Sequence, residues 1–133
     1  FYISQYQKLS ENFIREFKDK VDWEYISQFQ KLSEEIIREF QNKINIKNLK
    51  ININIKNNIR ENINIPKIYF QENCGKYKRT IYIFSDNKNI IKIGCTEYTQ
   101  QDAINNIKDE YNNIELRDDY INKVNKCFEE ANA

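Results

Sequence analysis

A tandem near-duplication over residues 2–47 limits the folds open to this chain more than any other feature of its sequence. Residues 2–24 read YISQYQKLSENFIREFKDKVDWE and residues 25–47 read YISQFQKLSEEIIREFQNKINIK, with fourteen of the 23 aligned positions identical. Units that repeat every 20 to 50 residues or so stack on one another, because each buries its apolar face on the next. We therefore predict a short array of two stacked repeats over residues 1–47.

Each repeat carries apolar residues at helical spacing. The pattern predicts a helix that reaches Val21 in the first repeat and Ile44 in the second. Ser10 and Ser33 stand where an N-cap belongs, and glutamates follow in the first turn. Asp22 is placed to cap a second, shorter helix of the same unit. The periodicity predicts the following repeat core: Leu9, Phe13, Ile14, Phe17, Trp23, Leu32, Ile36, Ile37 and Phe40.

Two structural alternatives stay open for the N-terminal half. A repeat of this length also suits a leucine-rich-repeat-like solenoid with one strand per unit. Residues 48–66 continue the pattern weakly, since Ile55, Ile59 and Ile63 align with core positions of the second repeat. This segment is predicted to be a degenerate third repeat or a cap. The apolar residues within 49–55 also alternate as in a half-buried strand, so helix and strand both remain possible assignments there.

The composition of the chain changes at about residue 67. Residues 79–84 and 89–94 are β-branched and aromatic runs on either side of a short turn, which predicts a β-hairpin. Thr99 then stands as the N-cap of one helix, and a second helix follows with Phe128 on its apolar face. The predicted fold is α+β, with these parts: helical repeats in 1–47, the Ile/Asn-rich segment 48–66, and a small module of one hairpin and two helices in 67–133.

Several classes of site are excluded by composition. Histidine is absent and glycine occurs twice, so there is no imidazole base, no Cys/His zinc site and no glycine-rich phosphate loop. The formal charge is +1, and no apolar run reaches transmembrane length. We expect no catalytic residues, no cofactor, no metal and no membrane partner. The odd set of Cys74, Cys95 and Cys127, without a CxxC motif, suits free thiols in a reducing, intracellular setting.

Charge is concentrated in the middle of the chain. Residues 47–82 hold eight basic and two acidic residues, a net charge of +6, and they include several aromatic side chains. A basic surface with aromatic residues suits nucleic acid, for which Lys76, Lys78 and Arg79 are the candidate contacts. A solvated linker explains the same charges without a ligand.

The unit YISQ(Y/F)QKLSE followed by IREF resembles the repeats of uncharacterised proteins encoded by mimivirus-type giant viruses. The abundance of Ile, Asn and Lys agrees with their AT-rich genomes, and the texts IYIFSD at 81–86 and IKIGC at 91–95 resemble a module that closes some of these proteins. The second repeat departs in having Asn45-Ile46 where the first has Asp22-Trp23. The resemblance implies a viral protein in the virion or in the cytoplasm of an infected amoeba, and it carries over no established activity. Because no methionine begins the chain, we expect Phe1 to be an internal residue or a processed end.

The hairpin text also resembles, more loosely, the core of GIY-YIG nucleases. Tyr82 lies in the first strand, and Lys92-Ile93-Gly94 replaces the Tyr-Ile-Gly of that family. Those enzymes need a second tyrosine, an arginine on the next helix and a metal-binding glutamate, whereas the helix after Thr96 begins with Gln100, Gln101 and Asp102. We therefore predict a non-enzymatic repeat protein that acts through protein–protein contacts or self-association. A structural component of the virion is one such role. The alternative is a nucleic-acid-binding module on a degenerate GIY-YIG-like core.

Overall fold

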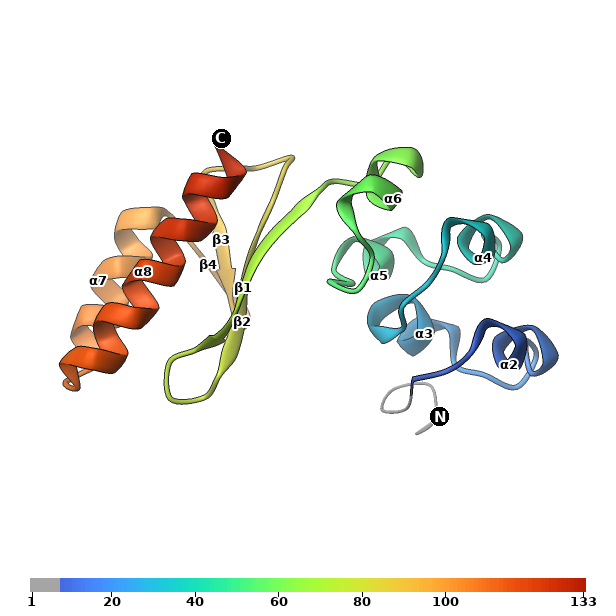
Figure 1. Ribbon diagram of the computed structural model, residues 1–133, viewed down its shortest axis with the longest axis horizontal. Helices are drawn as coiled ribbons and strands as arrows, with labels where there is room; N and C mark the ends of the chain where they lie inside the picture. The colour runs from blue at the N-terminus through green and yellow to red at the C-terminus, as the bar shows by residue number, and fades with distance from the viewer. Residues whose placement is uncertain (1–7) are drawn as a thin grey trace. The chain divides into compact units, whose positions relative to one another are not determined.

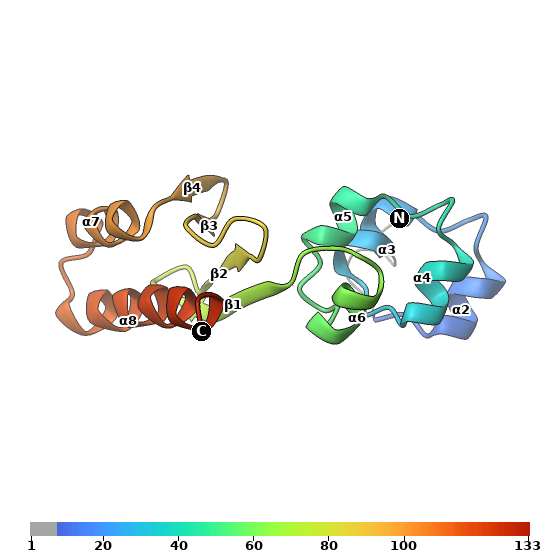
Figure 2. The same ribbon diagram turned by 90° about the horizontal axis from the view of Figure 1, so that it is seen from above.

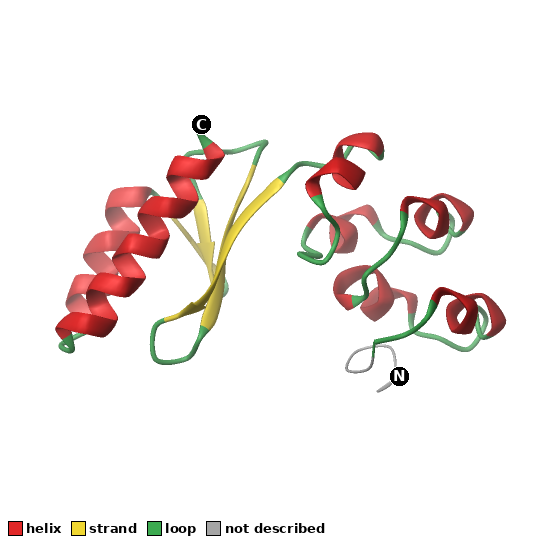
Figure 3. Cartoon of the chain, viewed as in Figure 1, coloured by secondary structure: helices red, strands yellow, loops and turns green. Residues whose placement is uncertain are grey.

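The computed structural model describes residues 8–133, which divide into two compact units, one ending at Pro66 and the other comprising Lys67–Ala133. The first unit is helical, and the second holds an antiparallel sheet and two longer helices (Figure 3). The predicted α+β class is confirmed. The part of the first repeat that falls on residues 1–7 lies outside the described residues. Within 8–133, no helix combines the length and apolar character needed to cross a bilayer.

Short helices recur through the first unit with the period of the sequence. The helices are α2 (Glu11–Glu16), α3 (Trp23–Phe29), α4 (Glu34–Glu39), α5 (Ile46–Lys50) and α6 (Asn57–Asn62). Helices α4, α5 and α6 begin one repeat length after α2, α3 and α4 respectively. One row holds α2, α4 and α6, and a second row holds α3 and α5 (Figure 1). The leucine-rich-repeat alternative and the strand assignment of 49–55 are wrong, since residues 8–66 contain no strand.

The predicted N-caps form, but the helices after them are shorter than expected. The Ser10 hydroxyl accepts from the Phe13 amide at 3.1 Å, and the Ser33 hydroxyl accepts from the Ile36 amide at 3.2 Å. Helices α2 and α4 end at Glu16 and Glu39 and do not reach Val21 and Ile44. Polar residues fill the next turn of each repeat, so a longer helix would bury no further apolar surface to stabilise it.

One buried cluster forms the core of the first unit. Phe13 and Phe17 lie outside this cluster, with their rings 4.5 Å apart and both side chains partly exposed. Their equivalents Ile36 and Phe40 are buried, because they belong to the layer that has described layers on both sides. Leu9 and Trp23 are half-buried and pack against the cluster. The buried members are Ile14, Ile26, Leu32, Ile36, Ile37, Phe40, Leu49, Ile55 and Ile65.

The second unit is a four-stranded antiparallel sheet covered on one face by two helices. The strands are β1 (Ile68–Cys74), β2 (Arg79–Phe84), β3 (Ile91–Ile93) and β4 (Thr96–Tyr98), in the order β1-β2-β3-β4. The helices α7 (Gln100–Glu110) and α8 (Ile114–Ala131) run side by side (Figure 2). Both lie on the same face of the sheet (Figure 1).

The predicted hairpin is β2–β3, with Ile81 opposite Ile93, and the predicted Thr99 cap accepts from the Asp102 amide at 3.2 Å. Strands β1 and β4 extend the sheet on either side of that hairpin and were not predicted. The second half of β1 is polar and its pairing is irregular between Gln71 and Cys74, while β4 has three residues. Neither segment shows a full alternation of apolar and polar residues, which is the signal that marks a strand in a sequence.

Candidate binding groove

Equivalent polar contacts join neighbouring layers of the repeat array. The Arg15 Nε on α2 donates to Glu39 on α4 at 3.0 Å. One layer further, the Arg38 guanidinium on α4 donates to the Asn62 carbonyl at the end of α6, also at 3.0 Å. Each contact joins a residue to the one 24 positions later, so the helices of one row stack with the same offset at both junctions.

Aromatic rings fill the space beside the first of these junctions. The Trp23 ring packs on the Phe40 ring with their centroids 4.9 Å apart. The indole Nε1 of Trp23 donates to the Lys18 carbonyl at 2.8 Å, which satisfies its one polar group. The first junction is therefore closed by an indole that is fixed by both packing and a hydrogen bond.

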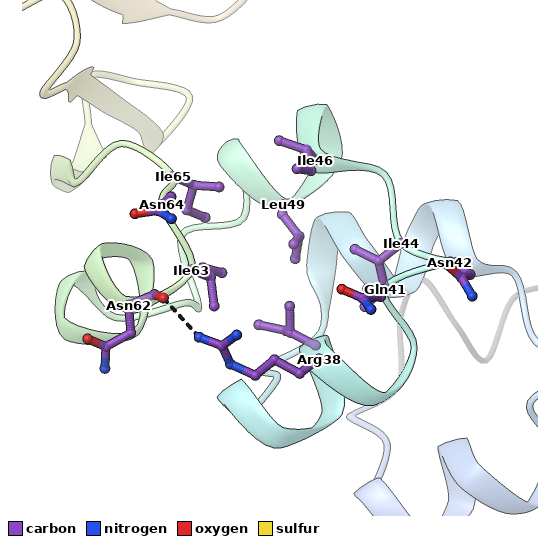
Figure 4. Close-up of a pocket in the computed structure, with 11 residues that line it drawn as sticks. Arg38, Gln41, Asn42, Ile44, Ile46, Leu49, Asn62, Ile63, Asn64 and Ile65 are labelled. Atoms are coloured by element: carbon purple, nitrogen blue, oxygen red, sulfur yellow. Dashed lines mark hydrogen bonds between the residues drawn. The ribbon is translucent and has the colours of Figure 1, made fainter.

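The second junction lacks these rings and is open. A shift of one repeat brings Trp23 to Ile46 and Phe40 to Ile63, so two aliphatic side chains replace two aromatic ones. Ile46 is 66% exposed, and a groove of about 390 Å³ lies among α4, α5 and the end of α6 (Figure 4). The groove is lined by Ile37, Arg38, Gln41, Asn42, Ile44, Ile46, Leu49, Asn62, Ile63, Asn64 and Ile65.

The lining combines apolar side chains with amides. Figure 4 shows Ile44, Leu49 and Ile63 pointing toward one another inside the groove, while the Arg38 guanidinium reaches across to the Asn62 carbonyl. Binding sites are typically apolar clefts in which a small number of polar groups fix the orientation of the ligand. This lining can therefore bury an apolar side chain and hydrogen-bond a peptide backbone beside it. Sequence reasoning missed the groove, although the replacement of Asp22-Trp23 by Asn45-Ile46 was its visible signal.

A buried arginine supports the third layer next to the groove. Arg60 is fully buried and stands at the position that Ile14 and Ile37 hold in the earlier repeats. Its guanidinium donates to the carbonyls of Ile55 at 2.8 Å and Lys50 at 2.8 Å; the remaining acceptors are the carbonyls of Pro66, at 3.0 Å, and Asn52. Burial lowers the pKa of the guanidinium to about 10, which leaves it charged at neutral pH. This side chain ties the irregular 50–55 loop to the end of the unit.

In the second unit, the three predicted nucleic-acid contacts lie together. Lys76, Lys78 and Arg79 are exposed in and beside the turn between β1 and β2, and we call them, with Tyr77, the basic turn. Tyr77 is 68% exposed, with the Lys76 ammonium 5.1 Å and the Arg79 guanidinium 5.5 Å from its ring centroid. A small hollow of about 90 Å³ adjoins Tyr77 and Arg79 and is walled by Tyr98, among others. The basic turn therefore presents cations around an accessible aromatic ring.

The positions that resemble a GIY-YIG core lie on the strands β2 and β3. Tyr82 pairs with Lys92 across the two strands. Tyr82 alternates with Ile81 and Ile83, which belong to the core under the helices, so its side chain lies on the other face of the sheet. Burial, with smaller contributions from Cys95 and Glu97, raises the pKa of the Tyr82 phenol, which opposes its ionisation.

The remaining chemical groups do not assemble into a site. Burial raises the pKa of the Cys74 thiol to about 11 and that of Cys127 to about 12, whereas Cys95 is exposed. Across residues 8–133, no three His, Cys, Asp or Glu side chains gather as a metal site would require. Within residues 8–133, the groove and the basic turn are thus the surfaces with features of a binding site. Comparisons of the chain with known protein families, with curated proteins and with solved structures found no match.

Proposed function

We propose that this chain is a protein-binding repeat protein whose N-terminal unit takes a segment of a partner protein into the groove among α4, α5 and α6. The observation that carries the proposal is the open second junction, where the apolar side chains of Ile44, Leu49 and Ile63 face a cavity edged by amides. A peptide bound there would bury an apolar side chain and satisfy its backbone on the amides. The repeat array supplies the rigid frame, since stacked layers fix the walls of the groove.

A peptide selection with the whole chain tests this function. We expect a random peptide library to yield binders that lose at least tenfold in affinity when Ile46→Lys places a charge at the groove. Ile114→Lys is the matched control, because Ile114 is 64% exposed on the other unit and Ile46 is 66% exposed. Affinities of the selected peptides for the three chains are measured by isothermal titration calorimetry. A selection without binders, or binders indifferent to Ile46→Lys, would contradict the proposal.

The resemblance to giant-virus repeat proteins supports a partner met in the infected cell or the particle, including a second copy of the chain. Peptide mapping by mass spectrometry of purified particles and, separately, of infected-cell lysate tests that context. Abundance in the particle supports a structural role. Detection in the lysate alone supports a role during infection and contradicts the virion assignment.

Nucleic-acid binding at the basic turn is the second candidate function. The observation that favours it is that Lys76 and Arg79 lie over the exposed ring of Tyr77, with the exposed Lys78 between them in the chain, since single strands bind to cations beside stacking aromatics. Replacing the three cations by glutamine is expected to weaken binding to a single-stranded oligonucleotide more than tenfold. The slope of log K against log salt should fall by about 2, at about 0.7 per phosphate contact.

Fluorescence anisotropy at low salt measures both quantities. The control carries the same charge change on the N-terminal unit, as glutamine in place of the exposed Lys8, Lys18 and Lys31. Equal losses in the two variants would show that net charge alone drives binding. That result, or the absence of binding by the wild-type chain, would remove this candidate.

A further inference from the structure

We propose that the groove binds the indole ring of a tryptophan carried by an acidic segment of a partner protein. This inference rests on the proposed function of the groove and specifies its ligand. The first junction of the array shows how an indole can be bound between two layers, since the Trp23 ring lies there. The equivalent place in the second junction is open. The ligand therefore takes the place that Trp23 occupies one layer earlier.

The walls of the two junctions correspond residue by residue. Ile37 and Leu49, which line the groove, stand at the positions of Ile14 and Ile26 in the preceding layer. Both pairs belong to the buried cluster against which Trp23 packs. The buried aliphatic pair of the first junction is thus repeated at the second, where isoleucines stand in place of the two rings.

The polar contact of the indole has an equivalent as well. Trp23 Nε1 donates to the Lys18 carbonyl, and Gln41 stands at the position of Lys18 and lines the groove. Tryptophan offers this carbonyl a ring N–H that only donates, whereas phenylalanine has no donor and the tyrosine hydroxyl is also an acceptor. We therefore assign the Gln41 carbonyl as the acceptor for the indole N–H of the bound segment.

Size and shape agree with a large ring. The groove has a volume of about 390 Å³, and the smaller Ile46 and Ile63 stand there in place of Trp23 and Phe40 of the preceding layer. The exposed Ile46 leaves the groove open to the outside, so a side chain can enter without displacing an element of the unit. Aromatic anchors in such pockets supply a large part of the binding energy of an interface.

Charge selects the residues on either side of the tryptophan. Residues 41–66 contain five basic residues and one acidic residue, and four of those cations remain when the buried Arg60 is set aside. Lys47 is exposed and follows the groove-lining Ile46 in the chain. Arg38 lies within the lining, 3.6 Å from Glu34, and Lys43, next to the groove-lining Asn42, lies 3.5 Å from Asp19. A segment with aspartate or glutamate around its tryptophan complements this surface.

The binding experiment uses three synthetic peptides and the full chain. One peptide carries a single tryptophan between acidic residues, the second has leucine in its place, and the third keeps the tryptophan between glutamines. We expect the acidic tryptophan peptide to bind at least tenfold more tightly than either of the others by isothermal titration calorimetry. Equal affinity of the leucine peptide would overturn the indole assignment, and equal affinity of the glutamine peptide would overturn the acidic one.

A variant that supplies its own ring gives an independent measurement. Ile46→Trp places an indole at the position equivalent to Trp23, and we expect it to weaken the acidic tryptophan peptide at least tenfold. The same variant should slow hydrogen exchange in α4 and α6, because the ring closes the open junction. Ile114→Trp is the control and should change neither result. Unchanged peptide affinity in Ile46→Trp would overturn the proposal even if the variant is well folded.

The outcomes of these experiments also distinguish the tryptophan assignment from the more general proposal that the groove binds a partner protein. Library binders that depend on Ile46 but lack tryptophan would overturn the indole assignment and leave the protein-binding function standing. If no peptide depends on Ile46, both fail. Peptides that bind through tryptophan and lose affinity in Ile46→Trp support both.

Discussion

Replacing Arg60 by methionine is expected to lower the free energy of unfolding of the N-terminal unit by about 3–5 kcal/mol, because four backbone carbonyls lose their donors in a buried place. The side chain is fully buried, and its partners are the carbonyls of Lys50, Asn52, Ile55 and Pro66. Each unsatisfied buried acceptor costs about 1–3 kcal/mol, and local relaxation with water entry recovers part of the sum. Lysine is expected to fail as a substitute, since one ammonium group cannot reach acceptors spread around a planar guanidinium.

Urea unfolding followed by the fluorescence of Trp23 measures this effect, because the chain has one tryptophan and it lies in the unit concerned. Arg38→Met is the matched control. Arg38 is exposed, lies 3.6 Å from Glu34 and donates to the Asn62 carbonyl, so its loss should cost less than about 1 kcal/mol.

Arg60→Ile makes the test sharper, since isoleucine holds the equivalent position in the two earlier repeats. If the carbonyls set the cost, this variant is destabilised about as much as Arg60→Met. A variant as stable as the wild type would show that the carbonyls find other donors and that the buried guanidinium is dispensable.

Replacing Gly75 by alanine is expected to destabilise the C-terminal unit by about 3 kcal/mol, from overpacking and a positive φ angle together. Gly75 is buried in the β1–β2 turn with φ of +71°. An added methyl group would collide with the Tyr111 hydroxyl and lie 2.7 Å from a ring carbon of Tyr120. Those two rings pack edge to face, with centroids 5.6 Å apart, so neither can move without disturbing the other.

Hydrogen exchange read by mass spectrometry resolves this effect, because peptides from β2 and α8 report on the second unit alone. Gly94→Ala serves as the control, since Gly94 also has a positive φ of +63° but faces the Arg79 guanidinium, the mobile end of a long side chain. We expect about 1 kcal/mol there. Equal losses at the two glycines would mean that backbone strain, and not the contact with the tyrosines, sets the cost at Gly75.

The helices and caps of the repeats could be predicted because their signals are local. Ser10, Asp22 and Ser33 lie within three residues of the amides they cap. At the start of α6 this local signal is missing, since Lys56 makes no side-chain cap hydrogen bond, and the sequence left helix and strand open there. The lengths of α2 and α4 were harder to predict. They depend on whether the next turn has a surface to bury against, which is a property of the packed array.

The groove and Arg60 could not be predicted for a related reason. A groove exists where atoms are missing between residues distant in sequence, and neither Ile46 nor Ile63 stands out in a sequence rich in isoleucine. Arg60 lies in a polar, lysine-rich segment, where the sequence suggests that an arginine is exposed. Its burial follows from the path of the 50–55 loop, whose carbonyls turn inward and need a donor. The clustering of the basic turn, in contrast, follows from its residues being neighbours in the chain.

The contacts of Arg15 with Glu39 and of Arg38 with Asn62 allow the array to lengthen by internal duplication during evolution. Each joins a residue to one 24 positions later, so an in-frame copy of residues 25–47 inserted after Lys47 would bring both partners with it. The duplication would add a layer in register and leave the layers on either side intact. In the last layer, Glu61 stands at the position of Arg15 and Arg38. A carboxylate there cannot donate the hydrogen bond by which those arginines hold the following layer. The gene can therefore lengthen the array from within, whereas growth beyond α6 would need a new kind of contact.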